Sequence, residues 1–196
     1  MILLSSDHPV SRERTAVCIL GRNMTENAIH QLFLAYSSSR LQQYSSHIEM
    51  CLIQLSDEQV WARGGENENS VGNLVLHLCG NMRQWIVAGV GGEADTRRRD
   101  DEFSRRGGLT SRDLTERLVT LVSQATAVMD GVSVQRLSER LVIQGYDVSV
   151  LDAIYHAVEH FAMHTGQIIF MTKMLTGKTL GLNHDVQSAA APHWNR

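Results

Sequence analysis

The chain has 196 residues, of which nine are histidine and only two, Pro9 and Pro192, are proline. This length fits one domain with a full hydrophobic core, and the 43% of hydrophobic residues excludes a disordered chain. A net charge of −3 gives no electrostatic reason to expect nucleic acid or an anionic membrane as a partner. The long stretch without proline permits long helices.

The cysteines and the N-terminus predict a location in the cytoplasm. The three cysteines, Cys18, Cys51 and Cys79, form no CxxC pair, and an odd number without a secretory signal is typical of a reducing compartment. No run of about 18 apolar residues is present, so no membrane span is expected. Residues 1–23 lack a clear hydrophobic period and are interpreted as an extension that is not native or poorly ordered. Translation could therefore start at Met24 rather than Met1.

Apolar residues at steps of three and four predict two helices in the first half of the chain. The first covers residues 25 to about 55, and Asn23 with Glu26 would form its capping box. Asn69 or Ser70 would cap the second, which runs to about residue 88 and is apolar on almost every side. Such a helix is expected to be buried, so its polar stripe needs partners. The stripe consists of Asn73, His77, Asn81 and Gln84.

Two further helices follow, each after a connection of about twenty residues. The third begins at Thr110 or Ser111, and the fourth is capped by Ser149 with Asp152 and ends near Gly177. The expected fold is an all-α four-helix bundle over residues 24–182, followed by a polar C-terminal tail, 183–196. The long connections suggest crossovers, and hence a topology other than up-down-up-down.

The first connection carries the one basic cluster of the chain, residues 97–99, which the acidic residues 100–102 follow at once. This local neutralisation predicts a solvated loop. In the second connection, residues 140–143 could be briefly extended.

Three histidines, His156, His160 and His164, follow one another at steps of four on the fourth helix. This spacing places them in one row, where neighbouring imidazoles can bind the same zinc, nickel, copper or iron ion. His77 could supply a further ligand from the second helix, which leaves an open position as in catalytic sites. Alternatively, His77 is a hydrogen-bonded core histidine. The pattern His156-x-x-Glu159-His160 also matches inverzincin proteases, but the acidic ligand expected downstream is missing.

Two stretches resemble the DinB-like superfamily of metal-binding four-helix bundles: Asn73-Leu-Val-Leu-His77-Leu-Cys-Gly-Asn81 and His160-Phe-Ala-Met-His164-Thr-Gly-Gln167-Ile168. The resemblance implies an up-down-down-up bundle over residues 24–182. It also implies that His77, His160 and His164 hold a divalent metal, nickel or zinc, with water completing the shell. Some members of that superfamily are S-transferases that use bacillithiol, mycothiol or related thiols.

Two hypotheses for the function follow. One is a metal-dependent enzyme acting on small molecules, such as a thiol S-transferase for electrophiles or, less favoured, a hydrolase, with a low-molecular-weight thiol as cosubstrate. The other is a non-catalytic metal-binding stress or sensor protein that forms a homodimer. In either case, five residues are expected to orient the ligands or contact a substrate: His156, Asn73, Asn81, Glu159 and Gln167.

Overall fold

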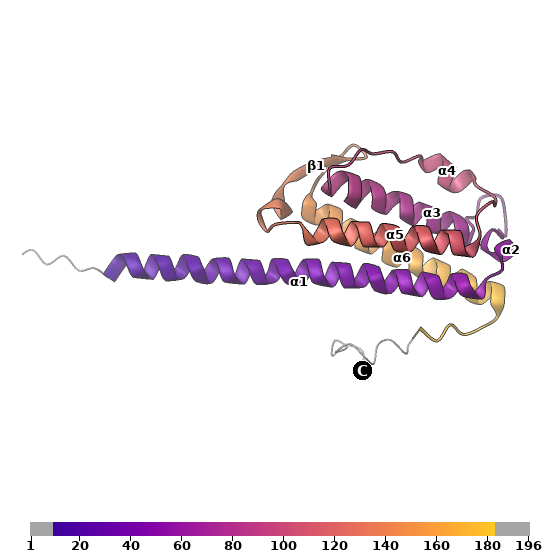
Figure 1. Cartoon of the computed structure of the whole chain (residues 1–196), viewed down its shortest axis with the longest axis horizontal. Helices are drawn as coiled ribbons and strands as arrows, with labels where there is room; N and C mark the ends of the chain where they lie inside the picture. The colour runs from indigo at the N-terminus through magenta and orange to yellow at the C-terminus, as the bar shows by residue number, and fades with distance from the viewer. Residues whose placement is uncertain (1–9, 183–196) are drawn as a thin grey trace, which may run out of the picture.

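The computed structural model describes the main chain of residues 10–182 and the side chains of residues 26–182. Within these ranges, four long helical stretches form an all-α bundle (Figure 1). They are α1 (Val10–Gln54), α3 (Val71–Met82) continued by the π-helix η1 (Arg83–Val90), α5 (Ser111–Asp130) and α6 (Val150–Thr176). Shorter elements fill the connections: α2 (Asp57–Val60), α4 (Arg99–Ser104), the 3-10 helix η2 (Gln135–Ser138) and the antiparallel hairpin of β1 (Arg140–Ile143) and β2 (Tyr146–Ser149).

The core lies where the long helices face one another. Large side chains from all four stretches are almost completely buried there: Leu41, Ile48, Leu52, Leu78, Met82, Ile86, Leu114, Leu118, Met129, Ile154, Phe161 and Ile168. Burial of so much apolar surface is the main favourable contribution to folding. No helix in the described part of the chain combines the length and the apolar character that crossing a membrane requires.

Capping boxes fix where three of the long helices begin. Ser70 caps α3, Thr110 caps α5 and Ser149 caps α6, and each accepts a hydrogen bond from the main-chain amide three residues later. The expected starts at these three positions are therefore confirmed. At the other end of α6, Gly177 adopts the left-handed conformation, with φ of 65°, that favours glycine after a helix.

Ser149→Ala is expected to lower the free energy of unfolding by about 1 kcal/mol, because the amide of Asp152 loses its acceptor. The same substitution at Ser123, an exposed position inside α5, is the matched control and should change stability little or raise it slightly. Urea denaturation followed by circular dichroism measures both. Equal effects of the two substitutions would contradict a capping role for Ser149.

The start of the first helix was predicted wrongly. Helix α1 begins at Val10, so Asn23 lies inside it and does not cap it. The N-terminal part of α1 projects beyond the ends of the other helices in Figure 1. Residues 10–23 contain no proline that would stop a helix. Residues 10–23 of the predicted extension therefore belong to α1. Residues 1–9 of the extension and the predicted tail, 183–196, lie outside the described residues.

The two long connections differ from each other. The first runs back along the length of the bundle and carries α4 (Figure 1). The second begins and ends at the same end of the bundle and contains η2 and the hairpin, so, contrary to expectation, it does not cross the length of the bundle. The stretch predicted to be extended, residues 140–143, is strand β1. The up-down-down-up order remains a prediction.

Candidate metal centre

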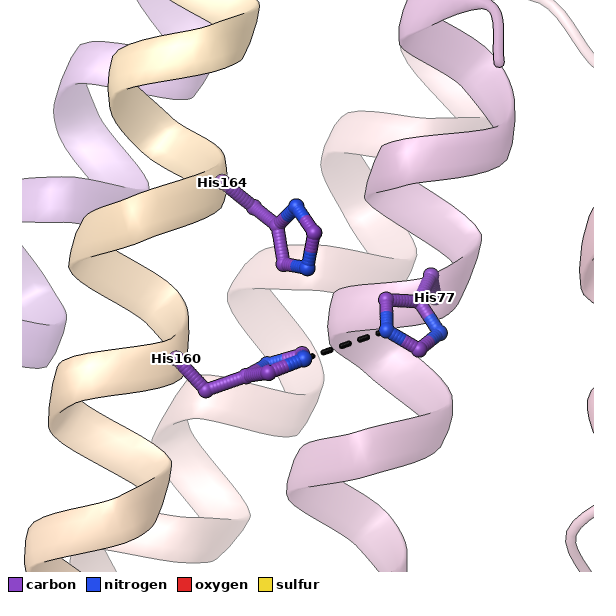
Figure 2. Close-up of side chains that lie close together, drawn as sticks. All are labelled: His77, His160 and His164. Atoms are coloured by element: carbon purple, nitrogen blue, oxygen red, sulfur yellow. Dashed lines mark hydrogen bonds between the residues drawn. The ribbon is translucent and has the colours of Figure 1, made fainter. Parts of the chain in front are cut away.

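Three histidines from two helices lie together inside the bundle. His160 and His164 project from α6 toward His77 on α3 (Figure 2). One ring nitrogen from each of the three can be chosen so that all lie within 4.8 Å of one another. The Nε2 atoms of His77 and His160 are 3.1 Å apart. The spacing of four residues places His160 and His164 on one side of α6, and the packing of α6 against α3 brings in His77.

A buried ion pair holds the other side of the His77 ring. Nδ1 of His77 lies 3.0 Å from Oε2 of Glu102, on α4. Arg97 donates hydrogen bonds to both Glu102 oxygens, at 2.8 Å each, and its Nη2 also lies 3.1 Å from His77 Nδ1. Because an ionised carboxylate can only accept a hydrogen bond, we assign the hydrogen of His77 to Nδ1, which donates it to Glu102. Arg97 can only donate, so its contact with Nδ1 is not a hydrogen bond in this tautomer. Nε2 then keeps its lone pair on the side of the other histidines.

Glu102 is ionised at neutral pH. Burial by itself raises the pKa of a carboxyl group, but hydrogen bonds from Arg97 and His77 outweigh it and hold the pKa of Glu102 below its usual range. The sequence did not predict this pair. The expectation of a solvated segment holds for residues 98–101, which are exposed, although part of the segment is the helix α4 rather than a loop. It is wrong for Arg97 and Glu102, whose side chains are only 3% and 9% exposed.

His164 is oriented in a similar way from its own helix. Its Nδ1 lies 2.6 Å from Oε1 of Gln167, one turn further along α6. An amide oxygen accepts a hydrogen bond, so this contact fixes the hydrogen on Nδ1. Nε2 then keeps a lone pair that can bind a metal ion. The structure therefore places Gln167 where an orienting residue is expected.

His160 is neutral at neutral pH, as a metal ligand must be. Burial, together with the neighbouring His164, His77, His156 and Arg97, lowers its pKa to about 3. Within the described part of the chain, its buried Nδ1 has no hydrogen-bond partner. Burial also lowers the pKa of His164.

The other predicted site residues lie at different distances from the cluster. Asn73 donates to the main-chain oxygens of Glu102, at 2.7 Å, and Arg105, at 3.0 Å, so it anchors the segment that carries Glu102. It does not contact a histidine of the cluster in any recorded hydrogen bond. Its action on the site therefore runs through the position of α4.

His156 lies beside the cluster rather than in it. Its ring packs on that of Trp85, with centroids 4.0 Å apart, and its Nε2 is 3.5 Å from Nδ2 of Asn81. Burial lowers the pKa of His156, while the charge of Glu159 raises it. Glu159 itself is exposed and has no recorded contact with the three histidines. An inverzincin site would need His156 and His160 on one zinc ion, with Glu159 as base, whereas the three side chains that could hold an ion are His77, His160 and His164.

Gly80 makes room for the Arg97–Glu102 pair. A Cβ atom at this position of α3 would collide with the Glu102 carboxylate and would also press on Arg97. Gly80→Ala is therefore expected to destabilise the fold by about 1–3 kcal/mol and to displace Glu102 from His77. Gly166→Ala is the matched control, because a Cβ there meets nothing within 4 Å, and it should stabilise α6 by about 0.5–1 kcal/mol. Thermal unfolding compares the two, and stabilisation by both would contradict this packing.

The donor set fits a divalent transition metal. Two of the three imidazoles have the hydrogen fixed on Nδ1 by a protein acceptor, as metal-binding histidines usually do. The separation of 3.1 Å between the Nε2 atoms of His77 and His160 is close to the roughly 3.3 Å that nitrogen ligands at 2.0–2.1 Å from a tetrahedral zinc would have. The three histidines could therefore hold one metal ion.

Comparisons with known proteins agree with this fold. The structure is similar to a conserved protein of Enterococcus faecalis, with a TM-score of 0.64, 17% identity, and coverage of 74% of this chain and 97% of that one. It is also similar to a DinB-like protein of Bacillus subtilis, with a TM-score of 0.57, 15% identity, and coverage of 74% and 94%. A DinB-like protein of Bacillus cereus gives a TM-score of 0.57, 12% identity, and coverage of 71% and 89%.

No curated protein matches the chain. At the level of sequence, residues 28–182 match the family described as "Protein of unknown function (DUF1572)". This match covers all of the long helices except the first part of α1. The chain therefore belongs to the DUF1572 family, and the resemblance to DinB-like four-helix bundles is confirmed.

Proposed function

We propose that the protein binds one divalent metal ion, nickel or zinc, through His77, His160 and His164, and uses it in a thiol S-transfer reaction on small electrophilic molecules. The observation that carries the proposal is the convergence of three ring nitrogens within 4.8 Å, on two facing helices. Three protein ligands leave a position for a further group, which is the arrangement of a catalytic rather than a structural site.

The cysteines support an external thiol. Burial raises the pKa of Cys79 to about 12, although Arg117 partly opposes it, and burial also raises the pKa of Cys51. Neither group forms a thiolate at neutral pH, so neither is poised as a nucleophile. These two are the cysteines whose side chains the structure describes, and neither is suited to supply the reacting sulfur. We therefore assign the reacting sulfur to a cosubstrate.

In the reaction, the thiol sulfur forms a bond to an electrophilic carbon, and the bond from that carbon to its leaving group breaks. The leaving group departs with the electron pair, and the thiol proton passes to solvent. A bound divalent ion would supply the positive charge that favours a thiolate at neutral pH. The chain's own contribution is to orient the imidazoles, through Glu102 behind His77 and Gln167 behind His164.

An assay with monochlorobimane tests the proposal. The metal-loaded protein is mixed with glutathione, cysteine, bacillithiol or mycothiol, and the fluorescent thioether is measured. We expect turnover with at least one thiol, and we expect chelation or His160→Ala to remove it. The matched control is His47→Ala, a histidine of α1 outside the cluster, which should keep the activity.

Two results would contradict the transferase. Turnover that survives His160→Ala would show that the cluster is not involved. No turnover with any of the thiols, in protein that retains its ion, would leave the metal site intact and favour the non-catalytic metal-binding protein.

A further inference from the structure

A cavity of about 600 Å³ lies between α3, α5 and the connection that carries α4. This volume falls within the range of about 300–1,000 Å³ that is common for small-molecule sites. Apolar side chains from three segments line part of it, among them Leu76, Leu109 and Leu121. None of the three clustered histidines lines it, but Glu102 does, so the cavity adjoins the candidate metal centre on the side of the Arg97–Glu102 pair.

Two of the four carboxylates that line the cavity are neutralised by arginines of the same connection. Glu102 is bound by Arg97 and contacts His77. Asp101 pairs with Arg98 at 3.1 Å. These carboxylates and arginines therefore add little net charge to the cavity.

The other two lining carboxylates belong to the start of α5. Asp113 accepts hydrogen bonds from the amide and the hydroxyl group of Thr110, at 2.8 Å each, as part of the capping box. Glu116 pairs with Arg112 at 2.8 Å. All four acidic groups of the cavity thus already have partners on the protein.

Two arginines of the lining have no such partner. Arg105 and Arg117 lie in the described part of the chain without a carboxylate within 4.0 Å, and Arg105 donates only to the main-chain oxygen of Gly107, at 3.4 Å. Arg83, also in the lining, pairs with Glu93 at 3.3 Å. Arg117 does act through its charge on Asp113, four residues earlier on α5, and helps to hold the pKa of that carboxyl below its usual range. The cavity therefore combines an apolar surface with two guanidinium groups that form no ion pair in the described part of the chain.

We propose that this cavity binds a small organic anion, a molecule with an apolar body and a carboxylate or sulfonate group. The apolar body would lie on Leu76, Leu109 and Leu121, and the anionic group would pair with Arg105 and Arg117. Planar guanidinium groups are well suited to such groups because they donate two parallel hydrogen bonds. The proposal does not depend on metal binding.

Fluorescence titration with anilinonaphthalenesulfonate tests this site in metal-free protein. The probe has an aromatic body and a sulfonate, and its fluorescence rises in an apolar site. We expect saturable binding, and about five- to tenfold weaker binding to the double variant Arg105→Gln/Arg117→Gln. The matched control is Arg140→Gln, which removes the same charge from the β1–β2 hairpin and should bind as the unaltered protein does.

Four further measurements test whether the probe lies in this cavity and whether its charge matters there. Gln124→Glu adds a negative charge to the lining and should also weaken binding, whereas His160→Ala/His164→Ala should not. Octanoate should displace the probe at concentrations at which inorganic phosphate does not. The proposal is overturned if neutral phenylnaphthylamine binds as tightly as the sulfonate, or if the double arginine variant and Gln124→Glu both bind the probe normally. Circular dichroism verifies that the variants are folded.

Discussion

Arg97→Ala is expected to lower the free energy of unfolding by about 3–5 kcal/mol, because it leaves a buried carboxylate without its partner. Arg97 binds both oxygens of Glu102, and the two side chains are only 3% and 9% exposed. The charge of Glu102 would then be held inside the protein by His77 alone. Urea denaturation at neutral pH, followed by circular dichroism, measures the loss.

The neighbouring Arg98 provides the control. Its side chain is 80% exposed and pairs with Asp101, so Arg98→Ala should cost about 0–1 kcal/mol. The double variant Arg97→Met/Glu102→Met should be more stable than Arg97→Ala, because it leaves no buried charge unpaired. Similar losses for Arg97→Ala and Arg98→Ala would show that the buried pair does not organise this part of the fold.

His160→Ala is expected to remove high-affinity binding of nickel and zinc. The rings of His77, His160 and His164 form a triangle with centroids 4.5 to 5.1 Å apart, and Nε2 of His160 is 3.1 Å from that of His77. Without it, the two remaining imidazoles are too few for the three-ligand site. Isothermal titration calorimetry on metal-free protein measures the change.

His156→Ala is the matched control for this substitution, since it removes a histidine one turn away on the same helix. His156 packs on Trp85 and lies outside the group of three, so the variant should keep most of its metal affinity. Loss of binding in His156→Ala but not in His160→Ala would mean that the ion is held elsewhere on α6.

The sequence predicted those parts of the fold that depend on local signals. The caps Ser70, Thr110 and Ser149 each satisfy an amide only three residues away, so the chain near the cap is enough to reveal them. The β1–β2 hairpin was recognised only in part, because its turn, Gln144-Gly145, carries a non-glycine residue at a positive φ of 54°. Asparagine or aspartate before the glycine is the usual signal for such a turn.

The same distinction applies to the site. His160 and His164 share a face of one helix, and the spacing of Gln167 three residues after His164 also lies within that helix. Glu102, however, reaches His77 across 25 residues of sequence, and its burial depends on the fold of the connection, on Asn73 and on the space at Gly80. Metal-binding histidines usually have an acceptor behind them, but that rule does not say which residue will provide it.

Metal content, measured by mass spectrometry with inductively coupled plasma, shows directly whether the three histidines hold an ion. The unaltered protein and the triple variant His77→Ala/His160→Ala/His164→Ala are stripped with a chelator, loaded with nickel or zinc, and freed of excess metal by gel filtration. We expect one ion per chain in the unaltered protein and almost none in the folded triple variant. Equal metal content in the two proteins would contradict a metal site at these histidines.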